Sequence, residues 1–283
     1  MKKSIFLCFI LLTICFFLTE GCIRRVKPGE NAVRFDSIEI DETCHLFNDT
    51  TQPCCNIRIH YVYPDSFNEQ STPELQNLFI EKMFGETFKG LSPEQVLKEY
   101  TQQYINSFRR FETSGTRGIF IEEEGNQYSD SSGYACYTQL HNSILYNQSG
   151  FISFLIETVD YAGGMHNSKC AYAYVVNLST GELLQEKDFA GINYRQNLSP
   201  ILVEKIAAAN GLTDSGELEN LGYISLSDIA PNANFTINNE GITYYFNENE
   251  IAGTREGIIR VFIPYDEIKF YVAEESPIAL FFN

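Results

Sequence analysis

The chain lacks tryptophan and is poor in methionine, histidine and basic residues. Its 37 acidic and 20 basic residues give a formal charge of −17, which disfavours nucleic acid as a partner because phosphate binding relies on Lys and Arg. Without tryptophan, a platform for stacking sugar rings would have to use some of the 17 tyrosines. This absence slightly favours a protein partner over a glycan.

The motifs of common catalytic sites are also absent. The chain contains no Gly-x-Ser-x-Gly elbow, no Ser-x-x-Lys, no His-Glu-x-x-His and no glycine-rich phosphate loop before a helix. Cys44, His45, Cys54 and Cys55 lie close together but lack the paired spacing of a zinc site. We therefore expect a protein that is not an enzyme, with no metal and no cofactor.

Residues 1–21 are typical of an export signal, with basic Lys2 and Lys3 ahead of an apolar run over residues 5–18. That run is short for a membrane span, and no later apolar run has the necessary length. The residues leading to Cys22 resemble a bacterial lipoprotein signal, so we expect lipidated Cys22 to anchor the protein in the cell envelope, facing the periplasm. The alternative is an ordinary signal peptide or an uncleaved anchor, with Cys22 incidental. Residues 22–43 would be a tether and a leading extended segment.

Excluding Cys22, five cysteines follow the signal, and export makes disulfides admissible. Strand-like runs over residues 33–46 and 55–63 predict a hairpin turning near Asp49, which brings Cys44 opposite Cys54 or Cys55. A bridge between Cys44 and one of these two would stabilise the hairpin by about 2 to 3 kcal/mol.

Helix and strand patterns alternate in a way that indicates an α+β fold. Helices are expected from Pro73 and from Pro93, where Ser92 and Gln95 form a capping box. Strands are expected over residues 134–146, 151–160 and 171–178, with the middle one central because both of its faces are apolar. Cys136 lies on the first of these strands and Cys170 comes directly before the third, with the central strand between them, so we expect both to be free. Beyond them, a helix is expected over residues 198–209 and strands over residues 235–237, 242–246 and 258–263.

A glycine-rich turn separates the strand that ends at Asp160 from the next one. It reads Tyr161, Ala162, Gly163, Gly164, Met165 and His166. Adjacent glycines between strands indicate a positive φ or a close backbone approach. Asp160 and His166 could form an orienting pair, but a hydrogen bond that pins the turn is the commoner use of such residues. Tyr161, Gly163, Gly164 and His166 are therefore candidates for shaping a binding face.

Four motifs occur in the order found in a known family. They are the turn at residues 161–166 and the segments 177–182, 244–252 and 262–268. In this order they resemble the extracytoplasmic module shared by the anti-sigma factor RsiV and the peptidoglycan deacetylase PdaC, over about residues 50–272. The resemblance implies two adjoining α+β domains of antiparallel strands and packed helices. We place a PdaC-like domain at residues 44–158 and an RsiV-like domain at residues 159–283.

Function follows from the expected anchor, the resemblance and the missing catalytic motifs. The leading hypothesis is a lipid-anchored, noncatalytic binding module of the cell envelope that recognises a lysozyme-like protein or a peptidoglycan fragment. The alternatives are a cell-wall hydrolase that uses Asp160 and His166, or a purely architectural envelope lipoprotein.

Overall fold

A computed structural model describes residues 29–113, 134–163 and 166–282. The expected signal, Cys22 and Gly164 lie outside these residues. Within the described ranges, no helix combines the length and the apolar character needed to cross a membrane.

The described residues form an α+β fold, as expected. The strands are β1 (Val33–His45), β2 (Cys54–Phe67), β3 (Gln70–Ser71), β4 (Tyr134–Gln148), β5 (Phe151–Tyr161), β6 (Ser168–Asn177), β7 (Glu182–Leu183), β8 (Phe235–Ile237), β9 (Gly241–Phe246) and β10 (Ile259–Pro264). The α-helices are α1 (Pro73–Phe84), α2 (Pro93–Thr113), α3 (Glu186–Phe189), α4 (Tyr194–Ala209) and α5 (Tyr265–Ile268). Short 3-10 turns are Leu46–Asn48, Glu86–Phe88, Ser215–Leu221, Leu226–Asp228, Thr254–Glu256 and Ala279–Phe282.

Seven strands form a large sheet in the order β1-β2-β4-β5-β6-β7, with β3 paired to β2. Neighbouring strands are antiparallel except β2 and β4, which run parallel because α1 and α2 carry the chain between them. β5 lies in the middle and its first six residues are all buried, which confirms its expected central position.

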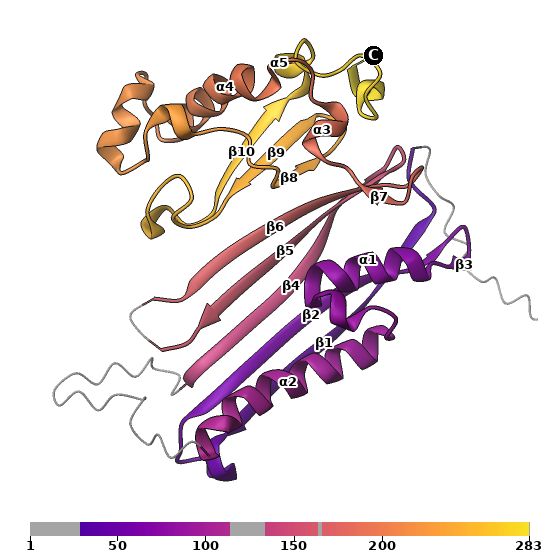
Figure 1. Cartoon of the computed structure of the whole chain (residues 1–283), viewed down its shortest axis with the longest axis vertical. Helices are drawn as coiled ribbons and strands as arrows, with labels where there is room; N and C mark the ends of the chain where they lie inside the picture. The colour runs from indigo at the N-terminus through magenta and orange to yellow at the C-terminus, as the bar shows by residue number, and fades with distance from the viewer. Residues whose placement is uncertain (1–28, 114–133, 164–165, 283) are drawn as a thin grey trace, which may run out of the picture.

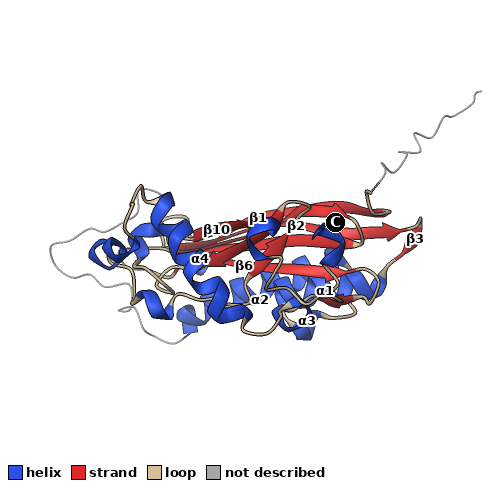
Figure 2. Ribbon diagram, turned by 90° about the horizontal axis from the view of Figure 1, so that it is seen from above, coloured by secondary structure: helices blue, strands red, loops and turns tan. Residues whose placement is uncertain are grey.

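Helices α1 and α2 cover one face of the large sheet (Figures 1 and 2). Phe79 of α1 stacks on Phe154 of β5, with ring centroids 4.1 Å apart. Leu97 and Phe108 of α2 are buried as well, so one side of this helix packs in the core.

A smaller sheet, in the order β10-β9-β8, lies between the large sheet and α4 (Figure 1). Tyr245 of β9 packs on Leu155 and Ala173 of the large sheet. The edge of β6 is also covered, because the side-chain amides of Asn234 and Asn247 accept from the backbone N–H groups of Ala173 and Ala171, both at 2.7 Å. These amides satisfy the backbone where a neighbouring strand would otherwise do so.

The domain boundary expected between residues 158 and 159 falls inside β5. β5 pairs with β4 on one side and with β6 on the other along nearly its whole length, so the large sheet does not divide at this point. The chain passes out of the large sheet only after β7, before α3.

Candidate functional site

The glycine turn lies at the end of the large sheet, between β5 and β6. Gly163 has a φ of +84°, which confirms that the turn requires glycine there. Tyr161 stacks on Tyr137 of β4, with centroids 5.4 Å apart. Gly163 and His166 are exposed, and both strands that the turn joins belong to one sheet.

The structure does not form the pair that a hydrolase would need. Asp160 accepts a hydrogen bond at 2.5 Å from the hydroxyl of Thr138, the residue opposite it on β4. No hydrogen bond joins Asp160 to His166, both of which are described residues. Asp160 thus fastens β4 to β5.

The hairpin of β1 and β2 places Cys44 opposite Cys55, and His45 opposite Cys54. Of the two partners expected for Cys44, Cys55 lies opposite it, but the expected bridge is not formed. The sulfurs are free thiols in the structure, as are those of Cys136 and Cys170. Cys136 has a neighbour that the sequence did not predict, because the parallel pairing of β2 and β4 places it beside Cys55.

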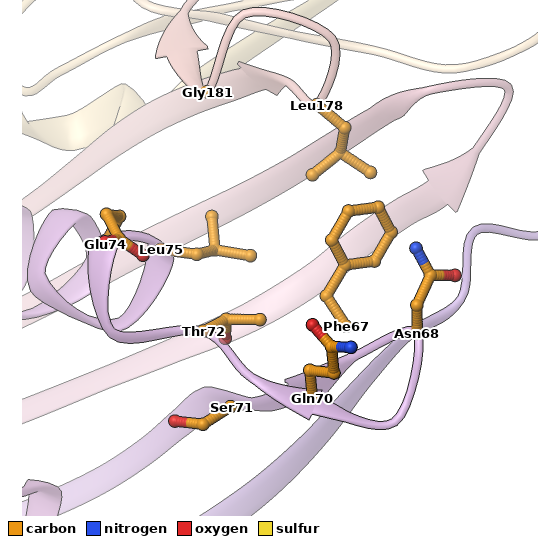
Figure 3. A pocket seen from close by; sticks show the side chains of 9 residues that line it. All are labelled: Phe67, Asn68, Gln70, Ser71, Thr72, Glu74, Leu75, Leu178 and Gly181. Atoms are coloured by element: carbon orange, nitrogen blue, oxygen red, sulfur yellow. The ribbon is translucent and has the colours of Figure 1, made fainter.

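A pocket of about 470 Å³ opens where the β2–β3 hairpin, the start of α1 and the β6–β7 turn meet (Figure 3). Three apolar side chains, Phe67, Leu75 and Leu178, converge on it. The other lining residues are Asn68, Gln70, Ser71, Thr72, Glu74 and Gly181. An aromatic ring among amides, hydroxyls and one carboxylate is a lining suited to a polar ligand that has one apolar face.

Thr72, one of the residues that line this pocket, has an unpaired hydroxyl. The residue is 8% exposed and precedes the first residue of α1, yet its hydroxyl does not cap the helix. Its oxygen is buried and has no partner among the described residues. Buried polar groups are normally paired, so a water or a ligand that reached this hydroxyl from the pocket would supply the partner that it lacks.

A partly buried polar cluster connects α3 and α4 to the small sheet. Burial raises the pKa of the Glu186 carboxyl, and hydrogen bonds from Tyr244 and from the N–H of Ala233 oppose part of that rise. The hydroxyls of Tyr194 and Tyr244 lie 3.0 Å apart. The three side chains join α3 and α4 to β9, which makes the cluster a structural link.

The pocket was not expected from the sequence, although parts of its lining were visible there. Residues 177–182 contribute to the resemblance described above but predict only a turn; the structure shows that Leu178 and Gly181 of this turn line the pocket. Phe67 and Leu75 are far from this turn in the sequence. Only the pairing of β2 with β3 and the packing of α1 on the sheet bring them to it.

Comparison with known proteins identifies a domain in the second half of the chain. Residues 183–266 match the family described as a protein of unknown function, DUF3298, so the chain contains a DUF3298 domain. This segment includes residues 244–252, one of the motifs on which the resemblance to RsiV and PdaC rests. No curated protein matches the chain.

Two solved structures resemble the whole described fold. A DUF3298-family protein from Bacteroides fragilis NCTC 9343 is 29% identical, with a TM-score of 0.75 over 87% of this chain and 95% of its own. A DUF3298-family protein from Pseudomonas aeruginosa PAO1 is 12% identical, with a TM-score of 0.58 over 86% of this chain and 96% of its own. The second likeness concerns the fold alone.

Proposed function

We propose that this chain, which contains a DUF3298 domain, is a noncatalytic binding module of the cell envelope, anchored through a lipid on Cys22. Its ligand would be a peptidoglycan fragment held in the pocket between Phe67, Thr72 and Leu178. The observation that carries this proposal is the unpartnered hydroxyl of Thr72 in that pocket.

The lining of the pocket suits a glycan with a short peptide. The ring of Phe67 offers an apolar surface for the face of a sugar, while Asn68 and Gln70 offer amides for hydroxyl and acetamido groups. Glu74 is the single carboxylate among the lining residues. Hydrolysis of a glycosidic bond ordinarily uses two carboxylates, so this lining supports binding and not cleavage.

A titration with a disaccharide–peptide unit of peptidoglycan tests the proposal. Thr72→Val keeps the shape of the side chain and removes the hydroxyl, so it should weaken binding about five- to tenfold, the effect of one lost hydrogen bond. The measurement is isothermal calorimetry on the purified wild-type and variant proteins.

Thr101→Val is the matched control. Thr101 lies in α2, is 3% exposed and also has a buried hydroxyl without a partner, but it does not line the pocket. Both variants should be at least as stable as the wild type, because each removes an unpaired buried group. Absence of binding by the wild type, or an equal loss of affinity in Thr101→Val, would refute the assignment of the pocket.

The charge of −17 favours a second candidate, a cationic lysozyme-like protein. Such a complex would form by electrostatic attraction and should weaken strongly as salt is raised. If Thr72→Val bound lysozyme as tightly as the wild type does, that partner would bind the acidic surface and not the pocket.

A further inference from the structure

Three cysteines on neighbouring strands lie side by side beneath α2. Cys44 of β1 is paired with Cys55 of β2, and Cys55 is paired with Cys136 of β4. All three belong to one packed cluster with Ile105 and Phe108 of the helix. Paired residues on adjacent strands lie about 5 Å apart and point to the same face, which is within the range that a disulfide can bridge.

The two sulfurs on β2 and β4 differ in their surroundings. Cys55 is fully buried, whereas Cys136 is partly exposed. Hydrogen bonds from the Cys55 thiol and from the Tyr104 hydroxyl lower the pKa of Cys136 to about 7, although burial opposes them. The hydrogen bond to Cys136, together with burial, raises the pKa of Cys55. Of these two thiols, Cys136 is therefore the one that ionises more readily.

The third sulfur has a partner of its own. Arg109 of α2 donates from Nε to Cys44 Sγ at 3.3 Å, and its Nη2 donates to the side-chain oxygen of Asn48 at 3.2 Å. These contacts tie Cys44 to the helix.

We propose that Cys136 and Cys55 are a thiol–disulfide exchange site for small disulfides, with Cys136 as the nucleophile and Tyr104 as its positioning residue. The Cys136 thiolate attacks one sulfur of the small disulfide, the S–S bond breaks, and one thiolate leaves. Cys55 then loses its proton and attacks Cys136 Sγ, which releases the second thiolate and closes a Cys55–Cys136 bridge. The pair of cysteines loses two electrons and the small disulfide gains them; Cys55 supplies one proton to the two released thiolates, and solvent supplies the other because Cys136 reacts as a thiolate.

Peptide mapping after reaction with glutathione disulfide tests the connectivity. The reduced full chain is treated, quenched in acid with N-ethylmaleimide and digested; we expect a Cys55–Cys136 link, with Cys44 alkylated. Cys136→Ser should abolish the link, while Cys44→Ser and the matched control Cys170→Ser should retain it. A Cys44–Cys55 link, a mixed disulfide that persists on Cys136, or no reaction would each overturn the proposal.

The rate of alkylation of Cys136 against pH tests the role of Tyr104. In the folded wild type at pH 7, Cys136 should react on the order of ten times faster than in the same chain unfolded in urea, where an ordinary thiol has a pKa of about 8.5. Tyr104→Phe should move the midpoint of the profile to higher pH without changing the disulfide mapped above. An unchanged profile in Tyr104→Phe, or equal rates in the folded and unfolded chains, would contradict this assignment.

Discussion

At the scale of single residues, the turn beside the pocket contains an unusual conformation. Asn68 and Glu69 connect β2 to β3 and have φ angles of 50° and 64°, as the central residues of a tight hairpin turn require. Asn adopts this region readily, whereas Glu does so at a cost. The hairpin between β4 and β5 meets the same need with Ser149 and Gly150.

Replacing Glu69 by Gly should stabilise the protein. Glycine removes the steric cost of a positive φ in the folded state, but it also makes the unfolded chain more flexible, which opposes folding. The net effect should be an increase of about 0.5 to 1 kcal/mol in the free energy of unfolding. The ion pair lost with Arg34 is 3.8 Å long and well exposed, so it contributes little. Denaturant titration measures the change. Gly150→Ala, at the equivalent place in the other hairpin, should have the opposite sign; a loss of stability in Glu69→Gly would contradict this explanation.

At the scale of elements, the periodicity of the sequence predicts most strands and helices, and contacts between distant segments explain the rest. The run over residues 151–160 is apolar on both faces, and β5 is buried on both. The pairing of β2 with β4 has no comparable pattern in the sequence, because it joins segments separated by two helices. For this reason the position of Cys136 beside Cys55 and the pocket under Leu178 could not be predicted.

A glycine in the small sheet tests how closely two strands pack. Gly241 opens β9, opposite Pro264 of β10, and a Cβ atom there would overlap the carbonyl oxygen of Ile263. Because the obstacle is backbone, Gly241→Ala should lower the free energy of unfolding by about 2 to 3 kcal/mol. Gly253→Ala is the control, since nothing lies within 4 Å of its added Cβ. Comparable stability of the two variants, by thermal denaturation, would show that the strands can separate without cost.

At the scale of the whole molecule, the two sheets share one core. Phe151 and Val175 of the large sheet belong to the same buried cluster as Leu202 of α4 and Ile263 of β10. The segment that matches DUF3298 begins in β7, which is itself part of the large sheet. A second buried cluster, with residues from Val33 to Val176, packs against α1 and α2, and the large sheet contributes residues to both clusters.

Ser153 makes a buried polar contact between the two sheets and allows this shared core to be tested. The residue is fully buried in β5; its hydroxyl donates to the carbonyl oxygen of Ile237 at 2.6 Å and accepts from the N–H of Ile237 at 3.1 Å. Ser153→Ala leaves both backbone groups of β8 unpaired, so it should lower the free energy of unfolding by about 2 to 3 kcal/mol. Scanning calorimetry of Ser153→Ala should show a single unfolding transition, at a lower temperature than that of the wild type.

Ser276→Ala is the control for this change, because Ser276 is also buried but its hydroxyl has no partner among the described residues. That variant should be as stable as the wild type or slightly more so, since it removes an unpaired polar group and leaves no other group unpaired. If Ser153→Ala instead split the calorimetric transition into two, the sheets would unfold separately. The core they share would then be too weak to make the chain one cooperative unit.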